Sequence, residues 1–365
     1  MPAQPVALVH DYLTQRGGAE RVALTLAETF PGAPLHTAFY DPDTTYPELA
    51  RCDVRPLSLD RIAVLRAHHR VAMPLLAPAF SRLHLDAAVT VCSSSGWAHG
   101  VRAAGRKVVY CHTPARWLYQ TDRYLRGSSP AVRAAMRVLG PPLRRWDRAA
   151  AVGAHRYLAN STVVRRRIAD TYGIDAEVVP PPNRFEVDGP TSSLDGIEPG
   201  FVLCVSRLLP YKNVDAVVAA FASLPDLRLV VVGGGPLAGA LAAGAPANVH
   251  LAGDVDDARL RWCYRNASAL VAASYEDFGL TPVEAAAAGL PVAVLRWGGF
   301  LDTTVEGETG VFFDDPEPGA IAAAVRELGR SSWDPSALAG HAANYSPAAF
   351  AARLRAVVAE EAALA

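Results

Sequence analysis

The sequence predicts an α/β fold made of two Rossmann-like, doubly wound domains. Its 365 residues are about twice the usual size of a single domain. Short apolar runs alternate with Ala-, Leu- and Arg-rich stretches along the whole chain, as in parallel sheets that helices cover on both faces. Residues 180–200, rich in Pro, Gly, Ser and Asp, interrupt this alternation, and it then restarts.

The first half contains five apolar runs that we expect to be strands. They are continuously apolar rather than alternating, which is typical of strands buried on both faces. In chain order they occupy residues 6–12, 85–94, 107–113, 155–161 and 176–182. A helix is expected to follow the first of them, from Ala19 to Phe30.

The second half repeats this pattern after the linker. Its expected strands occupy residues 200–208, 227–235, 248–255, 268–274, 291–297 and 309–313. The tail from Pro347 is expected to form an amphipathic helix with no strand after it. We therefore predict one domain over residues 1–182, a second over 183–346 and a final helix over 347–365. Two doubly wound domains are expected to bind ligands in a cleft at the carboxyl ends of their strands.

The composition is that of a soluble globular protein, with 51% hydrophobic and 19% charged residues. The five cysteines lack metal-ligand spacing, and an odd number without a pairing pattern favours a reducing compartment. The first residues do not resemble a signal peptide, and no window approaches the roughly 20 apolar residues that cross a bilayer. We expect a cytoplasmic protein.

The net charge of −1 conceals a difference between the two halves. Residues 1–182 hold 23 Lys and Arg against 14 Asp and Glu (+9), whereas residues 183–365 hold 12 against 22 (−10). Either the two halves attract each other, or the basic half meets an anionic acceptor or a membrane surface. A chain without net positive charge or a recognised binding module is not expected to bind nucleic acid.

The densest basic segment is 123–148, which has a single acid, Asp147. Its seven arginines are Arg123, Arg126, Arg133, Arg137, Arg144, Arg145 and Arg148. Apolar residues are interleaved with them, namely Met136, Val138, Leu139 and Trp146. The segment is either a peripheral membrane contact that serves a lipid-linked acceptor or a solvated, Arg-rich helix face.

The most informative segment is SALVAASYEDFGLTPVEAAAAGLPVAV, residues 268–294. It is expected to form a strand, a short loop and a helix. Glu276 lies in the loop, and Glu284, eight residues later, lies in the first helical turn. Backbone N–H groups at the helix start are expected to face an anion or a sugar hydroxyl. They belong to Phe278, Gly279 and Leu280.

This pair of glutamates with FGL between them, followed by AAAAGLPV, closely resembles the retaining glycosyltransferases of the GT-B fold, family 4 type. The resemblance implies that Glu276 contacts the transferring sugar and supports the charge that develops there. It implies that Glu284 hydrogen-bonds the ribose of the nucleotide, and that the final helix, residues 347–365, packs back on the first domain. The alternative is that both glutamates are solvated residues beside a helix start.

Further segments of the second half match the same family. SRLLPYKN, residues 206–213, resembles its donor-phosphate element, which implies that Arg207 and Lys212 neutralise the diphosphate leaving group. The alternative is a basic pair on an exposed helix start. Two weaker matches imply contacts near the nucleobase, through Gly234 in VVVGGGP and through Asp254 and Val255 in AGDVDD.

The first half matches the family as well. HDYLTQRGGAERVALTLAETF, residues 10–30, resembles the opening strand and glycine loop, where Gly17 and Gly18 let the backbone approach the donor diphosphate. YCHTPARWLYQ, residues 110–120, resembles a segment of a mannosyltransferase-rich branch, which implies that His112 is a catalytic-site residue facing the donor sugar. A purely structural histidine is the alternative. Ordered matches run from Val6 to about Asp315, although residues 58–84 hold no assigned motif.

The resemblance implies transfer with retention of anomeric configuration and without a metal. The departing phosphate can accept the proton of the acceptor, so no further protein base is required. Two Asp-x-Asp strings, Asp41-Pro42-Asp43 and Asp254-Val255-Asp256, match the pattern of metal-dependent transferases. We interpret both as turns, and we expect no metal or other cofactor.

The donor is expected to be a nucleotide diphosphate sugar, with GDP-mannose favoured over a UDP-hexose. The acceptor is a glycan, a lipid-linked molecule or a small molecule, and the sequence does not distinguish these. A nucleotide-sugar epimerase or hydrolase on the same fold is an alternative, as is a catalytically silent nucleotide-sugar-binding protein. The silent alternative is disfavoured because the four residues that the donor site needs are intact, namely Arg207, Lys212, Glu276 and Glu284.

Overall fold

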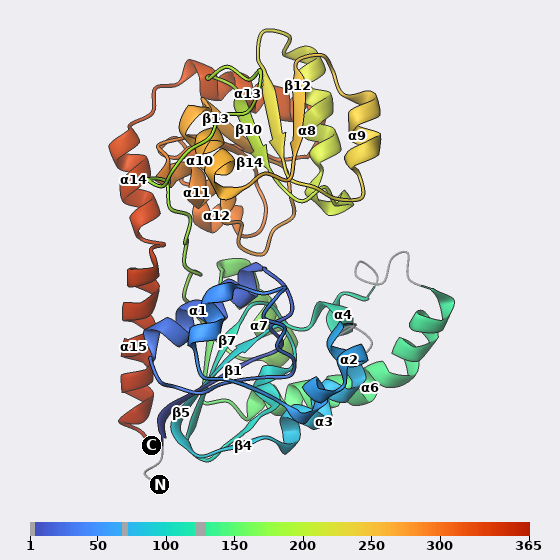
Figure 1. Ribbon diagram of the computed structural model, residues 1–365, viewed down its shortest axis with the longest axis vertical. Coiled ribbons are helices and arrows are strands. Elements are labelled where there is room, and N and C mark those ends of the chain that lie inside the picture. The colour runs from blue at the N-terminus through green and yellow to red at the C-terminus, as the bar shows by residue number, and fades with distance from the viewer. Residues whose placement is uncertain (1–3, 68–71, 122–128) are drawn as a thin grey trace. The chain divides into compact units, whose positions relative to one another are not determined.

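The computed structural model describes residues 4–67, 72–121 and 129–365. The chain divides into two compact units. The first comprises Met1–Pro182 together with Phe350–Ala365, and the second comprises Asn183–Ala349. Each unit is an α/β structure around one parallel sheet (Figure 1). The predicted fold class, two Rossmann-like sheets, is therefore confirmed.

The first unit contains a seven-stranded sheet in the order β3-β2-β1-β5-β7-β8-β9. Its strands are β1 (Gln4–His10), β2 (Leu35–Thr37), β3 (Val54–Pro56), β5 (Ala87–Ser94), β7 (Arg106–Cys111), β8 (Arg156–Ala159) and β9 (Glu177–Val178). All neighbouring strands pair in parallel. Each of the five predicted strands is present. The three-residue strands β2 and β3 were not predicted, because they are too short to show an apolar run.

The helices of the first unit lie between these strands along the chain, except α15, which follows the second unit. They are α1 (Gly18–Thr29), α2 (Ala63–Ala67), α3 (Met73–Arg82), α4 (Arg116–Tyr119), α6 (Pro130–Val152), α7 (Thr162–Tyr172) and α15 (Pro347–Ala362). Short 3-10 helices are η1 (Pro47–Arg51), η2 (Ser58–Arg61) and η3 (Ala98–Gly100), and a small second sheet pairs β4 (His84–Leu85) with β6 (Arg102–Ala103).

Alternate residues of β1 point to opposite faces of the sheet, as strand geometry requires. Leu8 packs in a cluster with residues of α1 and α15, whereas Val9 packs in a cluster with residues of α3 and α7. Helices therefore cover both faces (Figure 1), which explains why the strands are apolar at nearly every position.

The second unit contains a six-stranded parallel sheet in the order β12-β11-β10-β13-β14-β15. Its strands are β10 (Val202–Val205), β11 (Leu229–Val232), β12 (Val249–Gly253), β13 (Ala269–Ala272), β14 (Val292–Leu295) and β15 (Gly310–Phe313). Its helices are α8 (Val214–Ala220), α9 (Ala238–Gly244), α10 (Asp257–Asn266), α11 (Thr281–Ala287), α12 (Phe300–Thr303), α13 (Pro318–Arg330) and α14 (Pro335–Ala343). The 3-10 helices η4 (Pro210–Lys212) and η5 (Phe221–Ser223) flank α8. All six predicted strands are present.

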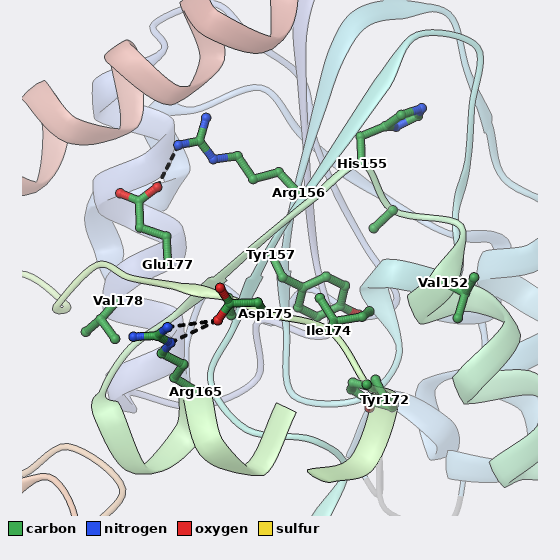
Figure 2. A pocket seen from close by; sticks show the side chains of 13 residues that line it. Val152, His155, Arg156, Tyr157, Arg165, Tyr172, Ile174, Asp175, Glu177 and Val178 are labelled. Carbon is green, nitrogen blue, oxygen red and sulfur yellow. Dashed lines mark hydrogen bonds and ion pairs between the residues drawn. The ribbon is translucent and has the colours of Figure 1, made fainter. Parts of the chain in front are cut away.

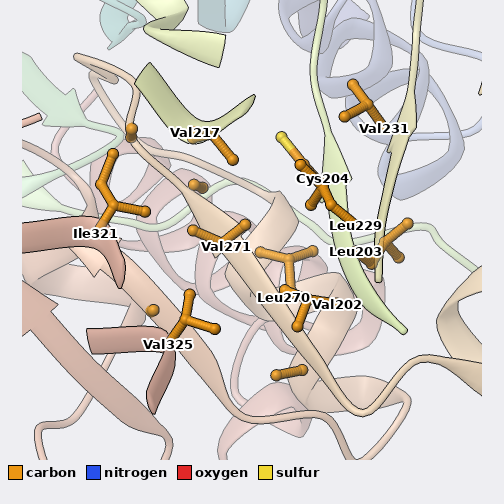
Figure 3. Close-up of a cluster of buried hydrophobic side chains, with 14 of the residues drawn as sticks. Val202, Leu203, Cys204, Val217, Leu229, Val231, Leu270, Val271, Ile321 and Val325 are labelled. Atoms are coloured by element: carbon orange, nitrogen blue, oxygen red, sulfur yellow. The ribbon is translucent and has the colours of Figure 1, made fainter. Parts of the chain in front are cut away.

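The core of the second unit surrounds its central strands (Figure 3). Val217 of α8 and Ile321 and Val325 of α13 pack in the same cluster as the strand residues Leu203 and Val271. Burial of each such side chain stabilises the fold by roughly 1.5–3 kcal/mol. This rigid core fixes the loops that follow the strands.

The C-terminal helix α15 is part of the first unit's core from Phe350 onward. The ring of Phe350 lies 5.5 Å from that of Tyr110 on β7, edge to face. Leu354 is completely buried in the same cluster. At the end of the helix, the Arg106 guanidinium lies 2.8 Å from the Glu361 carboxylate.

Among the described helices, none is both long enough and apolar enough to cross a membrane.

Replacing Leu354 with Ala is expected to destabilise the first unit by about 2–5 kcal/mol, because it leaves a cavity beneath α15. Urea unfolding followed by circular dichroism measures the loss. Arg355→Ala, on the exposed side of the same helix, is the matched control and should change stability by less than about 0.5 kcal/mol. Equal stability of the two variants would contradict the packing of α15.

Candidate functional site

The predicted donor-site residues of the second unit follow the carboxyl ends of its strands. In a parallel sheet these ends lie along one edge. The chain proceeds from β10 outward to β11 and β12, and then returns to the other side of β10 with β13 and β14. The loops after β10 and β13 therefore meet at the point where the strand order reverses, which is where α/β sheets bind ligands.

Lys212 and Glu276 meet at this point. Lys212 ends η4, after β10, and Glu276 follows β13, 64 residues later in the chain. The Lys212 ammonium donates a hydrogen bond to Glu276 Oε1. The side chains of Lys212 and Glu276 are 11% and 24% exposed, respectively, so the pair is mostly buried but still accessible to solvent. A cation and a carboxylate side by side can stabilise a leaving phosphate and a cationic sugar together.

The loop that carries Lys212 is held by its neighbours. Asn213 adopts a left-handed backbone conformation, with φ 51°, and donates from its side chain to the carbonyl of Ala273 at 2.8 Å. The Lys212 ammonium lies 5.0 Å from the centre of the Tyr211 ring. The exposed Arg207 donates to the Tyr211 hydroxyl at 3.4 Å. Tyr211 thus lies against both predicted phosphate-binding cations, a role that the sequence analysis missed.

The glycine-rich turn after β11 packs on the loop after β10. Gly233 has φ 128°, and a side chain at this position would collide with the carbonyl of Ser206. The carbonyl of Gly234 accepts from the N–H of Leu208 at 2.8 Å, and Gly234 lies beside the Asp254 carboxylate. The predicted base-loop residues are therefore neighbours of the Arg207 segment, and Val255 follows Asp254 in the same loop.

Glu284 occupies the first turn of α11, as predicted. The hydroxyl of Tyr264, a fully buried residue of α10, donates to Glu284 Oε2 at 2.7 Å. Burial and this carboxylate raise the pKa of Tyr264 well above its ordinary value. Tyr264 therefore remains a donor at physiological pH and fixes the carboxylate of Glu284. The sequence gives no periodic signal for this contact.

The FGL segment precedes α11. Phe278 is buried in a cluster with α11 and α14, and Gly279 lies against the ring of Phe300. The carbonyl of Leu280 accepts from the N–H of Glu284 at 2.9 Å and so opens the helix. The carbonyl of Glu276 accepts from Gly299 at 3.0 Å, which ties the loop to the turn after β14. Because α11 has only seven residues, its end contributes less field than a long helix would.

The first unit presents a second cluster at its own reversal of strand order, between β1 and β5. His10 ends β1, Ser93 lies near the end of β5, and His112 directly follows β7. His10 Nδ1 lies 3.0 Å from Ser93 Oγ, and Ser93 Oγ lies 2.8 Å from His112 Nε2. One hydroxyl therefore joins the predicted site residue His112 to a second histidine.

Both histidines are held neutral. Burial lowers the pKa of His10 to about 4, and burial together with the nearby His10 ring lowers the pKa of His112 to about 3. Neutral rings can each donate one hydrogen bond and accept one. The cluster therefore offers polarity without positive charge.

Asp11 fixes the loop beside these histidines. It is buried, and its carboxylate accepts from the backbone N–H groups of Ser95 (2.6 Å), Trp97 (3.1 Å) and Ala98 (2.6 Å). Burial raises the pKa of Asp11, whereas these N–H donors lower it. The polar string HDY at the end of an apolar run was a signal for both His10 and Asp11, although the sequence analysis did not single them out.

Gly17 and Gly18 lie at the start of α1, as predicted. A side chain at Gly17 would collide with the carboxylate of Glu20. Glu20 is buried, accepts from the Gln15 amide at 2.9 Å through Oε1, and leaves Oε2 without a hydrogen-bond partner within the described chain. Burial raises the pKa of Glu20 to about 7. His112 and this glycine loop belong to the first unit, and the Lys212–Glu276 pair belongs to the second.

Glu20 is expected to make stability depend on pH. The pKa of Glu20 is higher in the folded state than in the unfolded state, so the folded state is favoured most when Glu20 is protonated. The free energy of unfolding therefore falls as the pH rises from about 4.5 to about 7. Glu20→Gln should remove up to about 3 kcal/mol of this loss. Thermal melts at pH 5 and pH 8 should show that the variant gains much more stability over the wild type at pH 8 than at pH 5.

The matched control is Glu28→Gln, which alters an exposed glutamate of the same helix. It should leave the difference between pH 5 and pH 8 as in the wild type. A Glu20→Gln variant with the wild-type pH dependence would contradict the assignment of a buried, protonated carboxyl.

A depression of about 690 Å³ lies elsewhere in the first unit (Figure 2). It is lined by residues at the start of β8 and by the segment between α7 and β9, so it lies at the amino ends of the strands. Its charged groups are paired, with Arg165 2.9 Å from Asp175 and Arg156 2.6 Å from Glu177. None of the predicted site residues lines it.

The two Asp-x-Asp strings serve local structure. Asp41 accepts from the N–H of Asp43 at 3.2 Å, and Asp256 accepts from the N–H of Arg259 at 2.8 Å, at the start of α10. Within the described residues, no group of three or more His, Cys, Asp or Glu side chains is placed to hold a metal ion.

This chain is similar to known proteins both in fold and in sequence. Two solved structures show the similarity in fold. Anabaena HepE, solved in complex with UDP-glucose, is 15% identical, with a TM-score of 0.68 over 97% of this chain and 99% of that one. Sucrose-phosphate synthase from Thermosynechococcus elongatus is 18% identical, with a TM-score of 0.69 over 99% and 100%. These likenesses define the fold as GT-B.

The second similarity is in sequence. Residues 195–358 match the family model "Glycosyl transferases group 1". It is 31% identical over 212 residues to D-inositol 3-phosphate glycosyltransferase 2 of Catenulispora acidiphila, covering 48% of each chain. It is also 31% identical over 241 residues to D-inositol 3-phosphate glycosyltransferase of Mycobacterium tuberculosis, covering 56% of this chain and 49% of that one. The match spans about half the length of these relatives.

Proposed function

We propose that this protein is a retaining glycosyltransferase that moves a hexose from a nucleotide diphosphate donor to an acceptor hydroxyl. The observation that carries the proposal is the contact of Lys212 with Glu276 at the strand reversal of the second sheet. The group 1 domain match and the fold support it. Residues 1–182 form the acceptor-side domain and residues 183–346 the donor domain in this account, with the helix 347–365 packed on the former.

In this account, each part of the nucleotide-sugar donor is bound by its own set of residues. Arg207 and Lys212 bind the diphosphate, helped by the backbone at Gly17 and Gly18. Glu276 faces the sugar, together with His112 and the amides of the FGL segment, residues 278–280. The ribose binds Glu284, which Tyr264 holds in place. The nucleobase lies near Gly234, Asp254 and Val255, which the turns after β11 and β12 place beside the Arg207 segment.

The transfer requires one bond to break and one to form on the same face of the sugar. The bond from the anomeric carbon to the phosphate oxygen breaks, and the diphosphate keeps the electron pair. The acceptor oxygen then bonds to the anomeric carbon and gives its proton to the departing phosphate. Lys212 and Arg207 stabilise the negative charge and Glu276 the positive charge. In this account the side chains of Lys212 and Arg207 neutralise the diphosphate, so no metal ion is needed.

Two donors fit this account. The HTP segment around His112 favours GDP-mannose, whereas the structural neighbour HepE was solved with UDP-glucose. The acceptor is a glycan, a lipid-linked molecule or a small molecule, and the names of the sequence relatives make an inositol phosphate a compound to test. An epimerase or a hydrolase would use the same donor but would leave the acceptor unglycosylated.

Glu276→Gln is expected to lower kcat about 10²–10³-fold, because the variant cannot stabilise the cationic sugar, and to leave donor affinity largely intact. Lys212→Met should lower both kcat and donor affinity, since it removes a phosphate ligand. Release of the nucleoside diphosphate measures turnover, and calorimetry measures donor affinity. Glu308→Gln, an exposed glutamate of the same unit, is the control. Near-normal turnover of Glu276→Gln would overturn the site assignment.

We also propose that the protein, in the cytoplasm, touches the inner membrane surface through α6. Arg133, Arg137, Arg144 and Arg148 recur at spacings of four and seven residues, so they share one face of this helix. Val138 is 74% exposed beside that face and Val152 is 70% exposed. Cations flanked by exposed apolar side chains are typical of helices that bind anionic lipid. Arg123 and Arg126, also part of the predicted patch, lie outside the described residues.

Replacing Arg133 and Arg137 by Gln is expected to weaken binding to vesicles of phosphatidylcholine and phosphatidylglycerol about 30-fold, at about 1 kcal/mol for each arginine. Co-sedimentation measures the binding. The control replaces the exposed Arg166 and Arg355 by Gln and should bind as the wild type does. Equal binding of the wild type to vesicles of phosphatidylcholine alone would refute an electrostatic contact.

A further inference from the structure

We propose that Ser93 and His10 are positioning residues that set the ring orientation and the proton placement of His112. The inference rests on the proposed function, in which His112 faces the donor sugar. Nothing in the sequence motifs points to Ser93, which is the first of three serines at the end of an apolar run.

The three side chains form one continuous chain of hydrogen bonds across adjacent strands. β1 pairs with β5, where His10 is the register partner of Ser93. β5 pairs with β7, where Ser93 is the partner of Tyr110, two residues before His112. The hydrogen-bonded register of the three strands thus fixes the positions of the Cα atoms from which these side chains extend. His10 is 2% exposed and Ser93 is fully buried, so no water competes for the hydroxyl.

The chain of hydrogen bonds couples the tautomers of the two rings. Each neutral imidazole carries one N–H, and the Ser93 hydroxyl carries one proton. If Ser93 donates to His112 Nε2, then His112 carries its proton on Nδ1 and His10 donates to Ser93. If Ser93 donates to His10 Nδ1, then His112 donates from Nε2. In both arrangements the serine hydroxyl couples the two rings, so the tautomer of His10 fixes which nitrogen of His112 is protonated.

The same contacts hold the ring in place. Nε2 of His112 is tied to Ser93 on one side, and the ring lies 5.3 Å from the centre of Tyr110, near perpendicular. The backbone N–H of His112 donates to the carbonyl of Ser94 at 2.9 Å. Loss of the Ser93 hydroxyl would free the ring to rotate while leaving the backbone unchanged. It would also remove the hydrogen bond that each imidazole makes to Ser93, which costs free energy.

The chain offers a matched control on the same strand. Thr90 of β5 is fully buried, like Ser93, and its hydroxyl has no hydrogen-bond partner within the described residues. Thr90→Val removes that hydroxyl at nearly constant volume, just as Ser93→Ala removes the other. A general effect of altering β5 would appear in both variants, whereas an effect on His112 would appear only in Ser93→Ala.

Long-range proton–nitrogen NMR of the full chain, labelled with ¹⁵N-histidine, tests the proposal. The His112→Gln and His10→Gln variants assign the two rings. We expect one dominant tautomer for His112 in the wild type and in Thr90→Val, and a mixture of tautomers in Ser93→Ala. An unchanged His112 tautomer in Ser93→Ala would overturn the proposal. If Ser93→Ala does not fold, His10→Gln replaces it, and it must then change the His112 signals in the same way.

Turnover provides the second readout. Ser93→Ala should lower kcat about tenfold and change the KM for the donor by less than twofold, and Thr90→Val should change neither. A wild-type kcat in Ser93→Ala would overturn the positioning role. If the wild type turns over no nucleotide sugar, the proposed function fails, while the NMR result still decides whether Ser93 sets the His112 tautomer.

Discussion

The parallel direction of the strands is the constraint on which the rest of this structure depends. Every neighbouring pair in the two main sheets is parallel, so all strand carboxyl ends in a sheet lie along one edge. Residues far apart in the chain are thereby brought together, as Lys212 and Glu276 are in the second unit and His10, Ser93 and His112 are in the first. In both units the polar cluster lies where the strand order reverses.

Burial of a polar group costs free energy unless the fold supplies a partner. Asp147 of α6 is fully buried, accepts from Tyr119 (2.7 Å) and Tyr172 (2.8 Å), and lies 3.1 Å from His99 Nε2. The ammonium of Lys107 donates to the carbonyl of His99 at 2.9 Å. These contacts join α6, which carries the arginine face, to the same sheet that holds His112. Rigid support of this kind keeps the site loops in place.

Much of this architecture could be predicted from the sequence, since buried parallel strands are apolar at every position and the glycine-rich and proline-rich turns separate them. The predicted residues Lys212 and Glu276 were also found together. The contacts of Ser93 and Tyr264 could not be predicted. They join residues 83 and 20 positions apart and depend on strand order and helix packing, which apolar periodicity does not specify. Glu20 follows the predicted glycine loop, but only the folded chain shows that it is buried.

In the proposed function, the second unit binds a nucleotide diphosphate at the edge where the loops after β10 and β13 meet. Thermal shift and calorimetry of the intact chain with UDP, GDP and ADP, each with and without EDTA, test it most directly. We predict that one nucleotide stabilises the protein by about 2.7 kcal/mol at 100 times its Kd, that EDTA does not change this, and that Lys212→Met abolishes it. No stabilisation by any nucleotide, or an undiminished shift in Lys212→Met, would contradict the account.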